Sequence, residues 1–340
     1  MPVPFVYHPD YVTPLPEGHR FPMPKFGVIA ELLAAEGLVG EAGFAEPVRA
    51  TRDFVSRVHD AGYVDAFCDG GLAADAVRRI GLPWSPGLVN RTLTAVAGTR
   101  LTCELALRHG LACNTAGGTH HAHRGFGSGF CIFNDIAVAL KTLLDDGAID
   151  VALVLDLDVH QGDGTATLFA DDPRVVTASI HNATNFPLRK ATSDLDVALP
   201  DGMGDDEYLG LVMLGTPAVP AGRAAVTGAA SWAKRGWPGL AAMVEAVEPD
   251  LVVYDAGVDV HADDRLGRLA LTDDGLMRRD TAVLTTLREM GVPTACVIGG
   301  GYDADHRRLA SRHATLHRAA HAVTSSITSQ TAILASPTGG

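Results

Sequence analysis

The stretch VALVLDLDVHQGDG, residues 151–164, carries the strongest information about the fold. It begins with five apolar residues, the pattern of a strand that is buried on both faces of a parallel sheet. Asp156, Asp158 and His160 follow at alternate positions, which on a strand continuing to residue 160 would place their side chains on one face. A glycine-containing loop comes next, at the end of the strand where open α/β sheets bind their ligands. We therefore predict a central strand with a polar site at its carboxyl end.

Short β-branched runs alternate with longer amphipathic stretches on both sides of this segment. Strands that alternate with helices of this length indicate βαβ units, and therefore an α/β fold with a mainly parallel sheet and helices on both faces. Asn134 or Asp135 is a suitable N-cap for one of the helices. The predicted strands are residues 5–7, 111–114, 151–160, 175–181, 251–255 and 294–298, and the predicted helices are residues 25–36, 90–108, 135–146, 240–247 and 274–290.

The 340 residues contain no convincing linker and no internal repeat, so we expect a single catalytic domain over residues 1–322. Residues 212–238 are rich in Gly, Pro and Ala and are expected to form a long surface excursion. The segment 323–340 is rich in Ser and Thr and is expected to be a flexible C-terminal tail.

The composition indicates a soluble, acidic, cytoplasmic protein. Apolar residues make up 47% of the chain, which excludes a disordered or fibrous protein. No uncharged apolar run reaches the ~18 residues of a membrane-spanning helix, and the N-terminus does not have the pattern of a signal peptide. The five scattered cysteines indicate buried thiols in a reducing compartment. A net charge of −13 argues against nucleic-acid binding and mildly favours cationic partners.

Chemistry-bearing residues follow three further predicted elements. Asp259 lies four residues after the strand 251–255, and a glycine triplet precedes Tyr302. A glycine-rich loop, NTAGGTHHAHRGFGSGFCIFND at 114–135, contains the pair His120 and His121. Two carboxylates and one imidazole suit a catalytic divalent metal, for which we predict the ligands Asp158, His160 and Asp259. The two histidines are left as acid and base, and the phenol as an electrophile, which favours a hydrolase.

The blocks GGTHHAHRGFGSGFCIFND, DLDVHQGDG, YDAGVD with DRLG, and GGGYD resemble the histone deacetylase superfamily in order and spacing. Details such as HQGDG make the chain most similar to class IV and bacterial deacetylase-like members. The resemblance covers roughly residues 5–211 and 239–320. It implies an arginase/deacetylase α/β fold, with an eight-stranded parallel sheet flanked by helices on both faces and one catalytic zinc.

The resemblance also implies a role for individual side chains. No acidic residue clearly matches the rim aspartate with which some members bind the substrate backbone. The matched positions are the metal ligands Asp158, His160 and Asp259, the tandem histidines His120 and His121 with the carboxylates Asp156 and Asp163 behind them, the carbonyl-polarising Tyr302, the tunnel aromatics Phe130 and Phe186, and Asp156 with Ser179 as part of a structural K⁺ site.

The implied function is a zinc-dependent amidohydrolase that removes acyl groups, acetyl foremost, from acylated lysine side chains of proteins by metal-activated water. Fe²⁺, Mn²⁺ or Co²⁺ could occupy the same ligands. A deacetylase for acetylpolyamines or other small N-acyl amines is the main alternative. A ureohydrolase with two manganese ions and a non-catalytic acyl-lysine binder are the others. The sequence leaves the oligomeric state open.

Overall fold

The core of the protein is a parallel β-sheet. The computed structural model describes residues 2–215 and 236–334. Within them, seven strands run in the spatial order β1-β2-β7-β6-β3-β4-β5, and each neighbouring pair is parallel. This confirms the predicted α/β class, with seven strands in the described part of the chain instead of the eight expected. The strands are β1 Phe5–Val6, β2 Leu111–Asn114, β3 Ala152–Asp156, β4 Val175–Asn182, β5 Leu195–Leu199, β6 Leu251–Asp255 and β7 Thr294–Val297.

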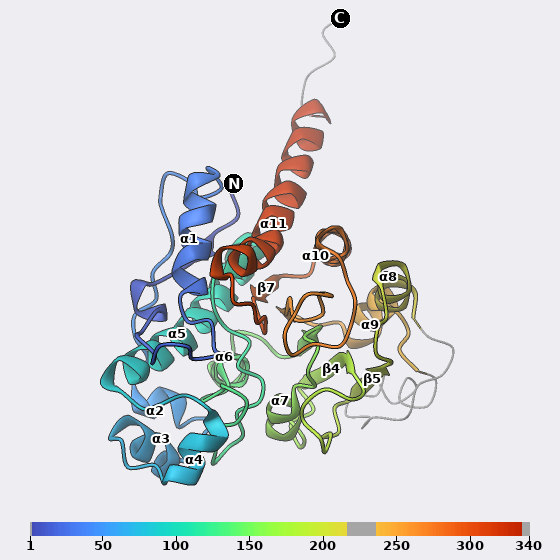
Figure 1. Ribbon diagram of the computed structural model, residues 1–340. Coiled ribbons are helices and arrows are strands. Elements are labelled where there is room, and N and C mark those ends of the chain that lie inside the picture. Colours follow the sequence, from blue (N-terminus) through green and yellow to red (C-terminus); the bar gives the residue numbers. More distant parts are fainter. Residues whose placement is uncertain (1, 216–235, 335–340) are drawn as a thin grey trace, which may run out of the picture.

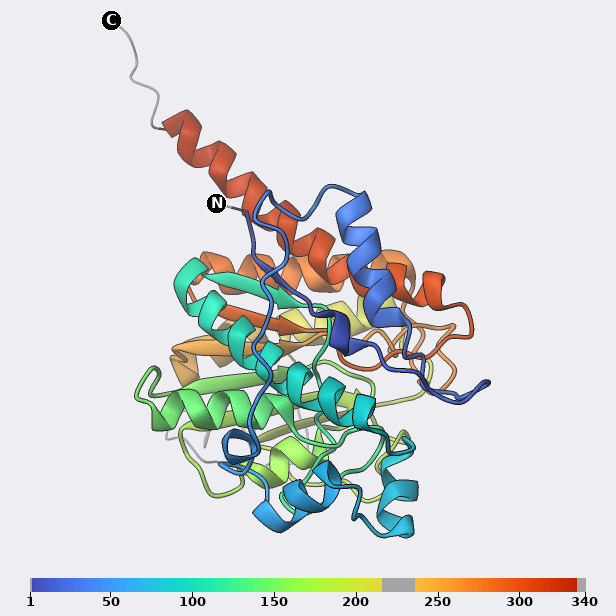
Figure 2. The same cartoon turned by 90° about the vertical axis from the view of Figure 1, so that its left-hand side faces the viewer.

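Helices cover both faces of the sheet (Figures 1 and 2). The long helix α5 packs against α6 on one face, whereas α10 packs against α8, α9 and α11 on the other, and α11 also packs against α1. The helices are η1 Pro9–Tyr11, α1 Lys25–Ala35, α2 Arg52–Val55, α3 Ala61–Cys68, α4 Ala74–Ile80, α5 Pro86–His109, α6 Asp135–Asp145, α7 Asp163–Leu168, α8 Asp205–Leu214, α9 Leu240–Val247, α10 Asp273–Glu289 and α11 His306–Leu334. None of the helices in the described ranges is both long and apolar enough to cross a membrane.

Local sequence signals determine where α6 begins and where α5 begins and ends. The Asn134 side chain accepts a hydrogen bond from the amide of Ala137 and so caps α6, as the sequence predicts. Ser85 caps α5 in the same way, with Pro86 in the first turn. At the other end of α5, Gly110 adopts φ 83°, a conformation that favours glycine, and the chain turns directly into β2.

The strand β3 ends at Asp156, so the prediction that it continues to residue 160 is wrong. Beyond it, Asp156 Oδ1 accepts a hydrogen bond from the amide of Asp158 at 3.1 Å, and Asp158 Oδ1 accepts one from the amide of His160 at 2.9 Å. Short polar side chains that bond to a backbone amide two residues ahead form turns that compete with a strand. The alternation of these residues therefore reflects two successive turns and does not follow the pleat of a strand.

The predicted elements did not include β5 and α11, nor the helices η1, α2, α3, α4, α7 and α8. β5 is an edge strand of five residues with one exposed position. In α11 the buried face includes Arg312, His313 and His317 among alanines, which conceals the apolar periodicity. This helix extends to Leu334, beyond the start of the expected tail at residue 323, and residues 335–340 lie outside the described part of the chain.

The excursion expected at 212–238 is described only at its two ends, because residues 216–235 lie outside the described part of the chain. These ends lie together: the indole nitrogen of buried Trp237 donates a hydrogen bond to the carbonyl of Val212 at 3.0 Å. The five cysteines are unpaired, as expected. The single domain over 1–322 and the cytoplasmic location stay predictions.

A buried arginine ties α10 to the turn that follows β6. The guanidinium of Arg279 donates to the carbonyls of Gly257 and Ala256 at 2.7 and 3.2 Å and to Asp280 Oδ1 at 2.9 Å. Asp280 also accepts a hydrogen bond of 2.6 Å from the hydroxyl of Tyr254. This network holds the turn through which the chain reaches Asp259.

Replacing this arginine should destabilise the protein strongly. In Arg279→Met, the buried carboxylate of Asp280 loses its cation, and breaking such a pair typically costs about 3–5 kcal/mol of unfolding free energy. The neighbouring Arg278 forms an exposed ion pair with Asp206, so Arg278→Met is the matched control and should change stability little. Urea unfolding followed by circular dichroism measures both variants. Equal unfolding midpoints would show that the Arg279 network is not a structural anchor.

Candidate metal centre and active site

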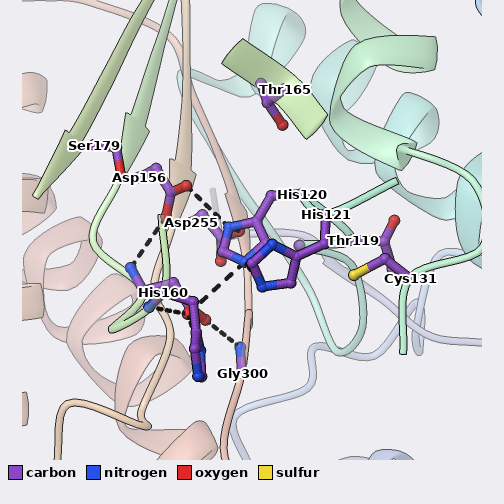
Figure 3. A network of polar contacts seen from close by, with 12 residues as sticks. Thr119, His120, His121, Cys131, Asp156, His160, Thr165, Ser179, Asp255 and Gly300 are labelled. Atoms are coloured by element: carbon purple, nitrogen blue, oxygen red, sulfur yellow. Dashed lines mark hydrogen bonds and ion pairs between the residues drawn. The ribbon is translucent and has the colours of Figure 1, made fainter. Parts of the chain in front are cut away.

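The polar side chains of the site converge at the carboxyl edge of the sheet. β3 and β6 are adjacent and in register, with Asp156 opposite Asp255 at their last residues. The loops that follow these strands meet the histidine-bearing loop after β2 and the glycine-rich loop after β7 (Figure 3). Because parallel strands all end at the same edge, segments far apart in the sequence surround one buried volume.

Asp158, His160 and Asp259 form the first cluster. His160 Nδ1 lies 3.0 Å from Asp158 Oδ1 and 3.1 Å from Asp259 Oδ2. One ligand atom from each residue falls within 4.8 Å of the others, and all three residues are buried. Burial and the adjacent Asp158 raise the pKa of Asp259 to about 7. Burial would lower the pKa of His160, yet its bonds to the two carboxylates raise it to about 10.

Backbone amides orient these carboxylates. The amide of Gly300 donates to Asp158 Oδ2 at 2.6 Å, and the amide of Val159 donates to Asp259 Oδ1 at 2.9 Å. A Cβ at position 300 would clash with both carboxylates, so only glycine allows this close approach. Two oriented carboxylates and an imidazole around one proton are a donor set that fits a divalent cation in the proton's place.

The tandem histidines lie beside this cluster with opposite protonation preferences. His120 Nδ1 lies 2.9 Å from Asp156 Oδ2, and His121 Nδ1 lies 2.7 Å from Asp163 Oδ1. Their Nε2 atoms are 3.2 Å apart. Burial alone would lower the pKa of His120, but Asp156 and its neighbouring carboxylates raise it well above the ordinary value. Burial and the neighbouring His120 lower the pKa of His121 to about 4, although Asp163 opposes this shift. At neutral pH, His120 is therefore cationic and His121 neutral.

The aromatic residues and Tyr302 line an open cavity of about 370 Å³ above the cluster. The ring of Phe130 lies 5.8 Å from that of Tyr302, and the ring of Phe186 lies 4.8 Å from His121 in an edge-to-face arrangement. Phe130 is buried, whereas Phe186 is 40% exposed. Burial of the Tyr302 phenol and the nearby Asp259 carboxylate raise its pKa well above 10, so that it remains a hydrogen-bond donor. The cavity therefore has aromatic walls and imidazole and phenol groups at its base.

The position of Tyr302 depends on two residues that the sequence analysis did not single out for this role. Asp264 Oδ2 accepts a hydrogen bond of 2.7 Å from the Tyr302 amide. The buried Lys25 donates to the carbonyl of Gly301 at 3.4 Å and lies 3.1 Å from His313 Nε2. Burial lowers the pKa of Lys25 to about 8. An isolated lysine in an N-terminal segment carries no sequence signal for such a contact.

Asp255 is a further buried group of the site. It lies at the end of β6, 3.8 Å from His120 Nδ1, and neither of its oxygens has a hydrogen-bond partner among the described residues. Burial and the adjacent Asp156 raise its pKa well above the ordinary value, so we infer that it is neutral at pH 7. Its place at the end of an apolar run, as for Asp156, was the available signal.

The structure brings together the sequence-predicted residues. Asp156 groups with His120 and Asp255, separately from Asp158, His160 and Asp259, which is the division that the family resemblance implies. Ser179 lies opposite Asp156 on β4, and its hydroxyl is 3.0 Å from His181 Nδ1. The K⁺ site expected at Asp156 and Ser179 stays a prediction.

Comparisons with known proteins agree over nearly the whole chain. Residues 19–318 match the family described as the histone deacetylase domain. An uncharacterized protein of Picosynechococcus sp. is 52% identical over 320 residues, or 94% of this chain and 99% of that protein. Histone deacetylase 2 of Arabidopsis thaliana is 29% identical over 84% of this chain and 70% of its own length. The acetoin utilization protein AcuC of Bacillus subtilis is 27% identical over 88% of this chain and 77% of its own.

Asp259→Ala should abolish metal binding by the Asp158 cluster, because it removes one of only three ligands. We expect a loss greater than the roughly ten- to hundredfold in affinity that follows removal of an outer hydrogen-bond partner. Asp264→Ala is the control: it removes a half-buried carboxylate that bonds to the backbone of the Tyr302 loop and should leave the metal bound. Elemental analysis and competition with a chelator measure occupancy. Full occupancy in Asp259→Ala would show that another residue is the third ligand.

Proposed function

The chain belongs to the histone deacetylase family, and from this we propose that it is a metal-dependent deacetylase that hydrolyses the side-chain amide of acylated lysine, with acetyl as the preferred acyl group. One observation carries the proposal: a buried carboxylate–imidazole cluster lies beside two adjacent histidines, each of which is bonded to its own carboxylate. Amide hydrolysis needs both a proton acceptor and a positive charge near the developing oxyanion.

The metal would be held by Asp158, His160 and Asp259. Zinc is the first candidate, and Fe²⁺, Mn²⁺ or Co²⁺ are also compatible with one nitrogen and two oxygen ligands. A bound divalent cation would polarise the acyl carbonyl and lower the pKa of a water molecule. The fit of a divalent cation to these residues rests on two carboxylates that both lie within hydrogen-bond distance of His160 Nδ1 and that backbone amides orient.

His121 is proposed as the general base and acid. Its Nδ1 is engaged with Asp163, so its lone pair lies on Nε2, 3.2 Å from Nε2 of His120. The depressed pKa keeps this nitrogen available to accept the proton of the attacking water. The same nitrogen then delivers a proton to the leaving amine. Asp163 fixes the tautomer and the orientation of the ring.

His120 and Tyr302 are proposed to stabilise negative charge. The carboxylate of Asp156 keeps His120 protonated, so a positive charge remains next to the reacting carbonyl. The phenol of Tyr302 donates a hydrogen bond to the acyl oxygen, most strongly once that oxygen has become anionic. Phe130 and Phe186 pack against the alkyl stem of the acyl-lysine, which directs the acyl group toward the cluster.

Turnover of defined amides tests this proposal. Protein loaded with zinc should deacetylate a fluorogenic acetyl-lysine peptide, lose activity on chelation and regain it when zinc is restored. Longer acyl-lysines and N-acetylputrescine are the comparison substrates, since the latter represents the polyamine alternative. The proposal fails if the loaded protein turns over none of these amides while acyl-lysine still binds, because that result describes a non-catalytic binder.

His121→Ala should remove nearly all turnover without releasing the metal. General acid–base catalysis contributes about 10²–10⁴-fold. Among the described residues that line the cavity, the other imidazole is that of His160, which is assigned to the metal. His109→Ala, at the exposed end of α5 opposite the site, is the control and should behave as wild type. Initial rates are measured together with the metal content. Turnover within a few-fold of wild type would exclude His121 as the base.

Tyr302→Phe should lower kcat about 10²–10³-fold with a much smaller change in KM, because an oxyanion donor acts mainly on the transition state. Tyr63→Phe is the matched control, since the Tyr63 hydroxyl donates to the carbonyl of Ile132 and Tyr63 is not among the residues that line the cavity. It should reduce stability slightly and leave kcat unchanged. Steady-state kinetics and melting temperature separate the two effects. A Tyr302→Phe variant with normal kcat and a lowered melting temperature would assign Tyr302 a purely structural role.

A further inference from the structure

The mouth of the active-site cavity carries positive charge. Arg20 and Arg79 line it together with Phe130 and Phe186, and no Asp or Glu is among the residues that line this cavity. The guanidinium of Arg20 lies 5.1 Å from the centre of the Phe130 ring. That of Arg79 lies 5.0 Å from the ring of Phe126. Each cation is therefore held over an aromatic face at the rim of the site.

Neither arginine is neutralised by the described part of the protein. Both side chains are exposed, and no carboxylate within residues 2–215 and 236–334 forms an ion pair with them. Other exposed arginines do have such partners: Arg52 pairs with Asp69 at 2.5 Å, and Arg278 pairs with Asp206 at 2.8 Å. The two rim charges are thus available to a ligand.

A third cation supports the opposite side of the mouth. The ammonium of Lys190 donates to the carbonyls of Asn185 and Pro187, at 2.5 and 3.0 Å, and these residues flank Phe186. Its hydrogen-bond partners are neutral, although the carboxylates of Asp163 and Asp196 lie close enough to act on its charge. The mouth is therefore basic on a chain whose net charge is −13. A local field opposite to the overall charge concentrates anions at one place on the surface.

We propose that this mouth selects acyl-lysine substrates that carry a carboxylate close to the lysine backbone. This inference rests on the proposed deacetylase function. When the alkyl stem lies between Phe130 and Phe186, the backbone of the substrate is left at the rim, within reach of Arg20 and Arg79. The anion is either an acidic residue next to the acyl-lysine in a peptide or the α-carboxylate of free Nε-acetyl-lysine. The ammonium end of an acetylpolyamine would be repelled by the same charges.

Paired substrates test the preference. Two acetyl-lysine peptides that differ only in their flanking residues, Asp and Glu against Lys and Arg, should differ about tenfold in kcat/KM at low ionic strength, the size expected of two exposed ion pairs. The difference should shrink as salt is raised, because the Debye length falls from ~10 Å at 0.1 M to ~3 Å at 1 M. Free Nε-acetyl-lysine compared with its α-carboxamide distinguishes the two sources of the anion.

Charge reversal at the rim assigns the effect to these residues. Arg20→Glu and Arg79→Glu should each reduce the preference, and the double variant should reverse it through KM with kcat little changed, since neither side chain contacts the reacting amide. Arg108→Glu, exposed at the opposite edge of the sheet, carries the same charge change and should keep the wild-type preference. Melting temperatures confirm that each variant is folded.

The outcomes separate this inference from the function on which it rests. Equal kcat/KM on acidic and basic peptides, or an unchanged preference in the double variant, overturns the inference while the deacetylase function stands. Faster turnover of N-acetylputrescine than of the acidic peptide also overturns it. No turnover of any acyl-lysine overturns the proposed function itself.

Discussion

The site depends on the compensation of buried negative charge at the ends of β3 and β6. Asp156, Asp158, Asp255 and Asp259 are all buried there. Carboxylates removed from water must be paired, protonated or bound to a cation. Two imidazoles and four backbone amides meet part of this demand, protonation meets another part at Asp255, and the shared position around His160 suits a divalent metal. The amide of Gly300 holds the carboxylate of Asp158 in place, and Arg279 anchors the turn after β6 that leads to Asp259.

The uneven distribution of buried carboxylates also gives the neighbouring His120 and His121 opposite pKa shifts. His120 faces Asp156, with Asp158 and Asp255 also nearby, and these carboxylates outweigh its burial. His121 is bonded to Asp163 and lies beside the positive charge of His120. Burial and this charge outweigh the effect of Asp163, so the pKa of His121 is lowered. A difference in proton affinity between adjacent residues is what an acid–base mechanism requires, because one group must hold its proton while the other exchanges it.

Charge also differs between the whole molecule and its active-site mouth. The net charge of −13 favours cationic partners when the chain is considered as a whole. At the mouth, however, Arg20, Arg79 and Lys190 are not bonded to carboxylates, so the field that an approaching substrate meets there is positive. Because charges on exposed surfaces act mainly within a Debye length, the proposed substrate preference depends on these local charges and not on the net charge.

The sequence by itself determined the α/β class and the bounds of β2, β6 and α9, and it limited the cap of α6 to Asn134 or Asp135, because apolar periodicity and capping depend on residues close along the chain. Motif order likewise indicated the residues of the two clusters. Only the tertiary structure decided where β3 ends and that Lys25 and Asp264 bond to the loop that carries Tyr302. These features depend on β3 lying beside β6 and on contacts such as Val159 with Asp259, 100 residues apart. Charge compensation acts through space, and no local pattern records which side chains become neighbours.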